Sequence, residues 1–322
     1  MSFLVNLILW SIYGKDPKKG TIIPQFYPPH NWSPTEVLFL MNEGKEDDNI
    51  FAAQLLQLAV KGHIKIEKQK SKKDLFIISY ADKTSKQQEL NEIEQGFIDR
   101  LLGNKDFTVI QEKYNPRVAI SLNYLVSKIE EKQAGLYFNK RRKLLVPQYV
   151  VPVISIICMA IAYNYYEGPV WLITLSGGIM VIMNMLFMKL FYQPTKEGRK
   201  MLDHILGLEM FIKYADEQRI NVTNKPDMNF DYFEKNLPYA IAFGKANAWG
   251  KKFPAQEIEA KYQSSNYYVA GYSFRNIGYF SALSAVSSSA SIAPSATGSA
   301  GGGFSGGGFS GGGAGGGGGG GW

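Results

Sequence analysis

The sequence contains few of the cysteine and histidine residues from which metal and redox sites are built. It contains one cysteine, Cys158, in an apolar run, so no disulfide, zinc knuckle or CxxC pair can form within the chain. The three histidines, His30, His63 and His204, are scattered, and there is no HExxH motif and no GxSxG elbow after a strand. We therefore expect no catalytic site, no metal and no cofactor, and we expect that the protein is not an enzyme.

Charge is nearly absent from the end of the chain. From Gln263 to Trp322 the only charged residue is Arg275, and glycine becomes more frequent toward the terminus. Such a segment has too little apolar mass to offset the entropy lost on ordering, so we predict that residues 263–322 form a disordered Ser/Gly-rich tail. Isolated aromatic residues could make the tail weakly adhesive, and an inert extension is equally compatible with the sequence.

Two long runs contain almost no charge. Residues 146–192 hold two mostly apolar stretches of about twenty residues, the length that spans a bilayer, separated by Glu167, Gly168 and Pro169. Basic residues flank both stretches, whereas the loop between them has no lysine or arginine. Because cytoplasmic flanks carry the excess of positive charge, the pattern predicts a transmembrane helical hairpin with both ends in the cytoplasm. A buried hairpin in a large soluble core is the alternative.

The basic flank before this hairpin is the one binding site that the sequence suggests. It consists of Lys140, Arg141, Arg142 and Lys143. Basic side chains close to a membrane surface attract anionic lipid headgroups, with about 1 kcal/mol for each residue. We therefore expect anionic-lipid contact at these four residues, although most of their charge has the ordinary role of setting topology.

A shorter apolar segment begins the chain. The run from Phe3 to Tyr13 has about eleven residues, roughly half of what a helix needs to cross a ~30 Å hydrocarbon core. It lacks the basic start and the small-residue cleavage site of a secretory signal. We expect residues 1–13 to be part of a transmembrane helix that ends at cytoplasmic lysines, or an apolar segment at the membrane interface.

Residues 14–143 carry helix signals followed by strand signals. Ser33 and Glu36 have the spacing of a capping box around Pro34, and a second helix pattern ends at Gly62. Two strand patterns follow, over residues 63–69 and 74–80, around a polar turn. This order predicts a winged-helix-like cytoplasmic α+β domain.

Two further amphipathic helices are expected in the same domain. Apolar residues recur at helical spacing from Leu90 to Leu102 and from Val118 to Ile129. Residues 42–49, which join the first two helices, are acidic and would repel phosphates at the start of a recognition helix. We therefore expect an interaction or packing module, and we do not expect nucleic acid as a partner.

Residues 193–262 are expected to form a cytoplasmic helical segment. One amphipathic helix is predicted around residues 201–215, and a helix pair broken by Pro238 is predicted around residues 229–253. Because the hairpin returns to the same side of the membrane, the regions before and after it can pack together as one body.

Several motifs together resemble a known family. They are "YGKDPKKGTIIPQFYPP", "SPTEV", "LLQLAVKGHIKIE", "FEKNLPYAIAFGKANAWGKKF" and the Gly-rich run that closes on Trp322. In this order, and over nearly the whole chain, they resemble a family of predicted bacterial membrane proteins described as domain of unknown function 2207. Members of that family begin with a signal sequence and an extracytoplasmic β-rich domain, so the resemblance implies that Met1 is a truncated or misplaced start. It implies no particular activity, cofactor or catalytic residue.

Together these features predict an integral membrane α-helical protein of the bacterial inner membrane. Its transmembrane hairpin joins α+β and helical regions that lie, with the tail, on the cytoplasmic side. We expect a non-enzymatic interaction or signalling scaffold, with the lipid bilayer and an unidentified protein as partners. Two alternatives remain: a membrane-tethered nucleic-acid-binding regulator that uses the winged-helix-like domain, and an enzyme whose site is assembled across domains.

Overall fold

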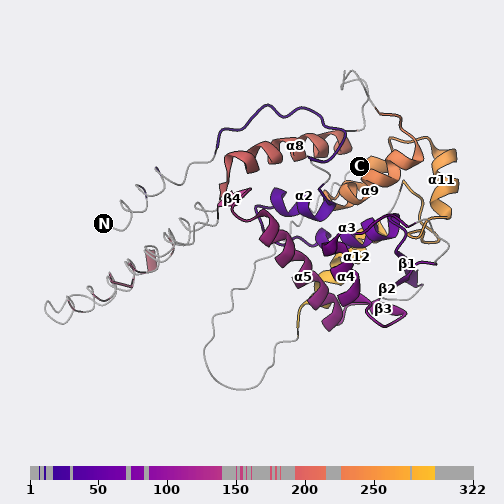
Figure 1. Ribbon diagram of the computed structural model, residues 1–322, viewed down its shortest axis with the longest axis horizontal. Coiled ribbons are helices and arrows are strands. Elements are labelled where there is room, and N and C mark those ends of the chain that lie inside the picture. Colours follow the sequence, from indigo (N-terminus) through magenta and orange to yellow (C-terminus); the bar gives the residue numbers. More distant parts are fainter. Residues whose placement is uncertain are drawn as a thin grey trace, which may run out of the picture.

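The computed structural model describes most of the chain on either side of the predicted hairpin. The described residues are 17–29, 32–69, 74–82, 87–139, 193–214, 226–275 and 278–293, with single positions among residues 7–11 and 150–182. They form a body of helices with a small antiparallel sheet at one edge (Figure 1). Within these ranges, no helix combines the length and the apolarity that crossing a bilayer requires.

The sheet has three strands in the order β1-β2-β3. They are β1 (Ile64–Gln69), β2 (Leu75–Tyr80) and β3 (Phe107–Ile110), and both pairings are antiparallel. Ile66 lies opposite Ile78, which in turn lies opposite Thr108. Side chains alternate between the two faces of a strand, so one face of β1 and β2 carries the buried Ile64, Ile66, Phe76 and Ile78, while most side chains of the other face are exposed on β1 and half-buried on β2.

The winged-helix interpretation is not supported. The two helices and the β1–β2 hairpin are present as predicted, but β2 also pairs with a third strand, since all four residues of β3 lie opposite residues of β2. The hairpin is therefore part of a three-stranded sheet, with β2 as its central strand, and not a free two-stranded wing. Strand β3 was not predicted because four residues are too few to establish an alternating pattern.

The core forms where helices from both halves of the chain meet. The central helix α3 (Asn49–Val60) packs against α2 (Pro34–Met41), α9 (Phe230–Ala242) and α12 (Tyr279–Ser291). Nine of the twelve residues of α3 are buried, so it is covered on nearly every side. The regions before and after the predicted hairpin therefore pack as one body, as the sequence analysis suggested.

Two helices cover the sheet side of the core. They are α4 (Glu92–Leu101) and α5 (Pro116–Gln133), which pack against each other and agree with the two predicted amphipathic helices. The side chain of Asn91 caps α4 and that of Asn115 caps α5. The remaining elements are β4 (Phe138–Asn139), β5 (Gln193–Pro194), α8 (Lys196–Lys213), α10 (Ala246–Gly250) and α11 (Ala255–Gln263).

The predicted disorder after residue 263 is wrong for the described part of that stretch. Helix α12 packs against α3 and α5, and Phe280 and Leu283 have at most 1% of their surface exposed. The prediction relied on composition and overlooked the helical spacing of Tyr279, Leu283, Val286 and Ala290, which gives α12 an apolar face. Residues 294–322, and with them the aromatic residues of the predicted adhesive tail, lie outside the described residues.

The predicted break at Pro238 is also wrong. Helix α9 continues through this residue, although proline lacks the N–H that would bond to the preceding turn, at a cost of roughly 3 kcal/mol. The residues on both sides of it, Leu237 and Tyr239, are buried, as is Ile241. Tertiary packing of these side chains holds the helix together where local propensity would end it.

Candidate functional site

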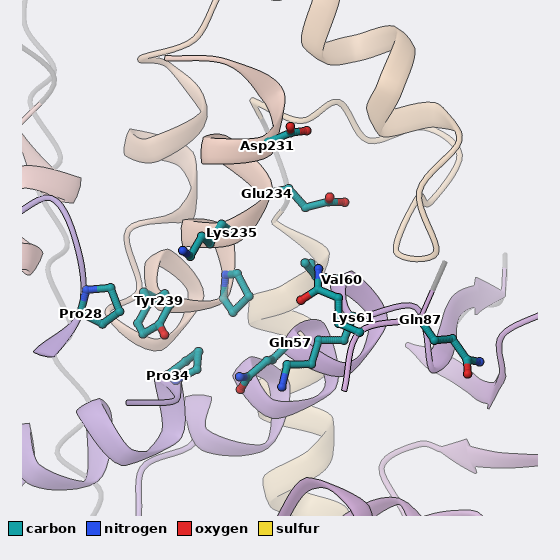
Figure 2. Close-up of a pocket in the computed structure, with 12 residues that line it drawn as sticks. Pro28, Pro34, Gln57, Val60, Lys61, Gln87, Asp231, Glu234, Lys235 and Tyr239 are labelled. Carbon is teal, nitrogen blue, oxygen red and sulfur yellow. The ribbon is translucent and has the colours of Figure 1, made fainter. Parts of the chain in front are cut away.

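A pocket of about 700 Å³ lies beside α9. Its walls come from α9, from the C-terminal end of α3, and from segments that precede α2 and α4 (Figure 2). The lining residues are Pro28, Pro34, Gln57, Val60, Lys61, Gln87, Gln88, Asp231, Glu234, Lys235, Pro238 and Tyr239. The volume lies within the range of small-molecule sites, and the lining combines proline, valine and tyrosine side chains with polar and charged ones.

Helix α9 brings opposite charges to this pocket. Figure 2 shows the carboxylate of Glu234 and the amine of Lys235 pointing in opposite directions. Burial raises the pKa of Glu234, and the nearby charge of Asp231 raises it further, while a hydrogen bond from Tyr267 Oη to Glu234 Oε1 at 3.1 Å acts in the other direction. The Lys235 amine lies 5.9 Å from the ring centre of Tyr27.

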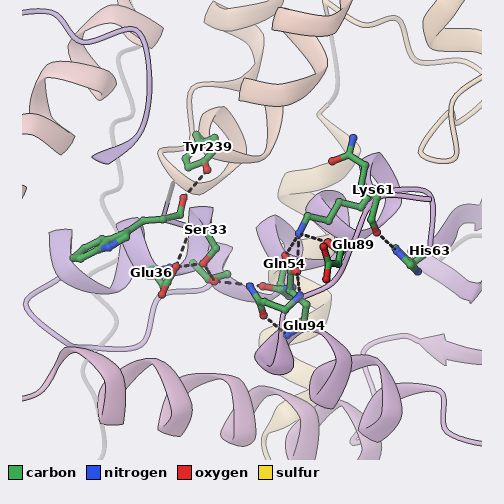
Figure 3. Close-up of polar contacts among 12 residues, drawn as sticks. Ser33, Glu36, Gln54, Lys61, His63, Glu89, Glu94 and Tyr239 are labelled. Carbon is green, nitrogen blue, oxygen red and sulfur yellow. Dashed lines mark hydrogen bonds and ion pairs between the residues drawn. The ribbon is translucent and has the colours of Figure 1, made fainter. Parts of the chain in front are cut away.

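The other lysine of the lining is held by a buried carboxylate. Lys61 Nζ donates to both oxygens of Glu94, at 2.6 and 2.8 Å, and to the carbonyl oxygen of Glu89 at 3.3 Å (Figure 3). The Glu94 side chain is only 2% exposed and also closes a capping box with Asn91 at the start of α4. The charge of Lys61 is therefore neutralised on the protein side of the pocket.

A second capping box lies on the other side of the pocket. Glu36 Oε2 accepts from the backbone N–H of Ser33 at 2.7 Å, as its sequence signature predicts, and Lys132 donates to Glu36 Oε1. Tyr239 donates its hydroxyl to the carbonyl oxygen of Trp32 at 2.6 Å, and burial raises the pKa of this hydroxyl (Figure 3). These bonds fix the segment before α2 against α9 and so fix one wall of the pocket.

The two segments that flank the predicted hairpin pair with each other. Strands β4 and β5 pair antiparallel, with Phe138 opposite Pro194 and Asn139 opposite Gln193. Thr195 Oγ1 donates to the carbonyl oxygen of Leu136 at 2.6 Å. We call residues 136–139 and 193–195 the clamp. Its two ends lie side by side next to the first turn of α8 (Figure 1).

An extended segment, residues 17–29, runs along α8, and we call it the strap (Figure 1). The N–H of Gly20 donates to Asp203 Oδ2 at 2.9 Å and that of Gln25 donates to the carbonyl oxygen of Gly207 at 3.1 Å. Gly207 has to be a glycine because a Cβ atom there would collide with the carbonyl oxygen of Ile23. The strap therefore fits α8 closely.

Burial alone would raise the pKa of Asp203, but hydrogen bonds from the strap and from α8 bring this pKa below its usual value. The hydrogen bonds from Arg199 and from the Gly20 N–H stabilise the charged carboxylate, and they outweigh the effect of burial. The next residue on α8, His204, also contacts the strap. His204 Nε2 lies 2.9 Å from the carbonyl oxygen of Tyr27, so both side chains hold the strap.

The sequence-predicted lipid contacts, Lys140, Arg141, Arg142 and Lys143, lie outside the described residues. The pocket was missed because its lining residues come from separate segments and share no motif. The Asn91–Glu94 capping box could have been found, because Asn-x-x-Glu before an apolar pattern is a helix-start signature. In the part of the chain that the structure describes, no group of three or more histidine, cysteine, aspartate or glutamate residues could hold a metal ion.

Comparison with known proteins gives one match. A family model described as the predicted membrane protein (DUF2207) C-terminal domain matches residues 23–253. The matched stretch begins within the strap, includes the whole clamp and α9, and ends shortly after α10. No curated protein and no solved structure matches the chain.

Proposed function

Because the chain belongs to the DUF2207 C-terminal domain family of predicted membrane proteins, we propose that it is a membrane-anchored scaffold for protein interaction or signalling. In this proposal residues 146–192 cross the bacterial inner membrane as a helical hairpin, and residues 1–13 add a partial span or an interfacial segment. The folded body lies on the cytoplasmic side, where it contacts a protein partner. The scaffold has no catalytic activity of its own.

The clamp is the observation that carries the proposal. Residue 139 and residue 193 lie opposite each other in an antiparallel pair, so residues 140–192 leave the body and return to it at the same place. A helical hairpin that crosses a membrane twice has both of its ends on one side, and adjacent ends suit two helices that pack against each other. The clamp also fixes the spacing of the two proposed helices at the membrane surface.

The described positions within the proposed hairpin support lipid contact. Val150, Ile154, Ile157 and Ile161 are helical, recur every three to four residues, and are 46–53% exposed. Leu175, Ile179 and Ile182 in the second stretch are 55–63% exposed. Exposed apolar rows of this kind are unfavourable in water and favourable in a bilayer.

Basic residues gather where the proposed membrane segments join the body. Lys196 and Lys200 lie on the first two turns of α8 and are exposed, as are Lys18 and Lys19 at the start of the strap. Together with Lys140, Arg141, Arg142 and Lys143, they would place positive charge close to anionic headgroups. This arrangement supports the proposed cytoplasmic orientation.

The buried hydroxyls support a structural role. Burial raises the pKa values of Tyr239, Tyr267 and Tyr279, and each hydroxyl donates a hydrogen bond within the body. Groups that are held protonated and are committed to internal bonds do not act as nucleophiles or bases at neutral pH.

Cysteine accessibility tests the topology. In a Cys158→Ser background, single cysteines would replace Lys105 and Lys251 on the exposed body and Gly168 in the hairpin loop. A membrane-impermeant maleimide would be applied to sealed vesicles of either orientation. We expect Lys105→Cys and Lys251→Cys to react only in inside-out vesicles, and Gly168→Cys only in right-side-out vesicles. Labelling of all three from the same side would overturn the proposed hairpin.

A soluble version tests the scaffold role. Residues 1–13 would be removed, and residues 140–192 would be replaced by a short Gly/Ser linker, which the adjacent ends of β4 and β5 allow without distortion. If the protein works by holding a partner at the membrane, the folded soluble body will not correct the phenotype of a deletion strain. Full correction by the soluble body would favour an enzyme with a soluble substrate.

A further inference from the structure

Strand β3 is an edge strand of the sheet, at the rim of the body (Figure 1). The direction of its backbone groups follows from β1, where the N–H of Ile66 leaves the sheet and donates to the carbonyl oxygen of Asn266 at 2.8 Å. Ile66 and Ile78 are therefore a pair without mutual hydrogen bonds. The N–H and C=O of one residue point to the same side of an antiparallel strand, so those of Ile78 point away from β1 and bond to Thr108.

The backbone groups of Phe107 and Val109, on either side of Thr108, consequently point away from the sheet. One contact confirms this direction, because the Val109 carbonyl oxygen accepts from Asn115 Nδ2, outside the sheet, at 3.0 Å. Among the described residues nothing bonds to the N–H of Val109 or to either backbone group of Phe107. Three backbone groups thus lie open at this edge, and an open edge can pair with another extended segment.

An apolar strip lies beside the open edge, on the outer face of the sheet, which is turned away from the core helices. It consists of Phe107, Val109 and Ile77, which lies opposite Val109. Phe107 is 53% exposed, and the other two are half-buried. The neighbouring charges of Lys65 and Glu67 pair with each other at 2.7 Å. The strip therefore offers an apolar contact without net charge.

The C-terminal tail leaves the body next to this edge. The carbonyl oxygen of Ala290, in the last turn of α12, accepts from the N–H of Asn115, whose side chain caps Val109. Phe304 lies eleven residues after Ala293, the last described residue, and eleven residues reach at most about 36–40 Å. The four residues of β3 span only about 13 Å, so the whole edge is within reach of Phe304.

The sequence of the tail suits a strand added to this edge. Gly-Gly-Gly-Phe-Ser occurs twice, at residues 301–305 and 306–310. A strand that places Phe304 on the outer face points Gly303 and Ser305 to the inner side, where the core helices lie, and small residues permit that close approach. Phe304 and Phe309 lie five residues apart, an odd spacing, so one strand places only one of them on the strip. The two motifs are therefore alternatives.

We propose that one Gly-Phe-Ser motif of the tail, at Phe304 or Phe309, pairs with the open edge of β3 and packs its ring against Phe107. Tethering holds the motif near the edge at an effective concentration on the order of mM, so a weak contact suffices. The inference goes beyond the scaffold role, because the tail then covers an edge that a partner's strand has to uncover before it pairs there. A failure of the topology experiment would leave this contact untouched.

Amide hydrogen exchange of the full chain in a neutral detergent tests the contact. The reporter is the N–H of Val109, which points out of the sheet. We expect it to exchange at least about fivefold more slowly in the full chain than in a chain that stops after Ala293. The N–H of Thr108, which bonds to Ile78, is the internal control and should exchange at the same rate in both chains.

Substitutions in the tail separate its aromatic rings from its length. Phe304→Ser and Phe309→Ser should each change the exchange rate at Val109 by no more than about twofold, because the other motif takes over. The double variant should exchange as fast as the chain that stops after Ala293. The matched control is the double variant of Ser305→Ala and Ser310→Ala, which keeps both rings and should leave the rate unchanged.

The partner ring on the body is tested separately. Phe107→Ser, at an exposed position, should abolish the protection of Val109 in the full chain and leave the rate in the truncated chain unchanged. A thermal melt of each variant confirms that the chain is folded.

Three results would overturn the proposal. The first is equal exchange at Val109 in the full and truncated chains, and the second is full protection in the double phenylalanine variant. The third is protection that rises with protein concentration, because the edge would then be covered by a second copy of the chain and not by its own tail.

Discussion

Lys132 Nζ donates to Glu36 Oε1 at 2.5 Å, although the two residues lie 96 positions apart. The Glu36 side chain is 7% exposed, and its other oxygen closes the capping box of α2. One carboxylate thus completes a local helix start and ties it to the last turn of α5. The N-terminal wall of the pocket depends on this bond because Pro34 is the first residue of α2.

Glu36→Gln should lower the free energy of unfolding by about 1–3 kcal/mol. The amide can still accept from Ser33, but it no longer offers a charged acceptor to Lys132. Chemical denaturation measures the change. Glu131→Gln is the matched control, since its pair with Lys128 is exposed and should contribute less than about 0.5 kcal/mol. Equal effects of the two substitutions would contradict the importance of the buried Glu36 carboxylate.

Gly207→Ala tests whether the strap packs against α8, because helix propensity and a steric clash with the strap would change the stability in opposite directions. Alanine is the better helix former by about 1 kcal/mol, so an uncovered helix would become more stable. A Cβ atom here would collide with the carbonyl oxygen of Ile23, so we expect a loss of about 1–3 kcal/mol instead. Hydrogen exchange of the Gln25 N–H, which bonds to Gly207, should become faster. A stabilised variant would show that the strap does not rest on α8.

Asp203→Asn should change the dependence of stability on pH. The pKa of Asp203 is lowered in the folded protein, so folding favours its ionised form. The stabilisation is therefore complete above the unfolded pKa of about 3.9 and is lost as pH falls through the lower folded value. Melting temperatures of the two proteins should differ by a constant amount between pH 6 and 8 and converge below about pH 4. A difference that persists undiminished in strong acid would contradict this assignment.

The sequence predicted those parts of the fold that local signals determine. The start of α2 followed from Ser33 and Glu36, and the two amphipathic helices that became α4 and α5 followed from their apolar spacing. In each case the residues that form the element also determine where it begins or which face it buries. Physical signals of this kind need no knowledge of the rest of the chain.

The features that sequence reasoning missed depend on distant partners. Helix α9 continues through Pro238 because α3 packs against it, and the clamp exists because residues 138 and 194 meet across the predicted hairpin. The pocket combines four segments of the chain, and the residues that line it, such as Gln57, share no sequence signature. The apolar residues of α12 recur at helical spacing in the sequence, but the low charge and the frequent serines of this region led to the prediction of disorder.

Truncations test where the folded body ends. A chain that stops after Ala293 keeps α12 and should melt within about 2 °C of the full chain, because it loses none of the described core. A chain that stops after Gly278 loses Tyr279, Phe280, Leu283 and Val286, all of which are buried. Each is worth about 1.5–3 kcal/mol, and together they approach the 5–15 kcal/mol by which a typical domain is stable. We therefore expect the shorter chain to lose cooperative unfolding.

Point substitutions in α12 separate its packing from the length of the chain. Leu283→Ala should cost about 2–5 kcal/mol, since the side chain is fully buried, whereas Ser281→Ala at an exposed position should change stability by less than about 0.5 kcal/mol. Calorimetry on both variants and both truncations measures the set. If the chain that ends at Gly278 melted like the full protein, α12 would be an appendage and the body would end at α11. A large loss from Leu283→Ala together with an intact melt after Ala293 would place the end of the fold within or just after α12, because the core needs this helix and nothing beyond it.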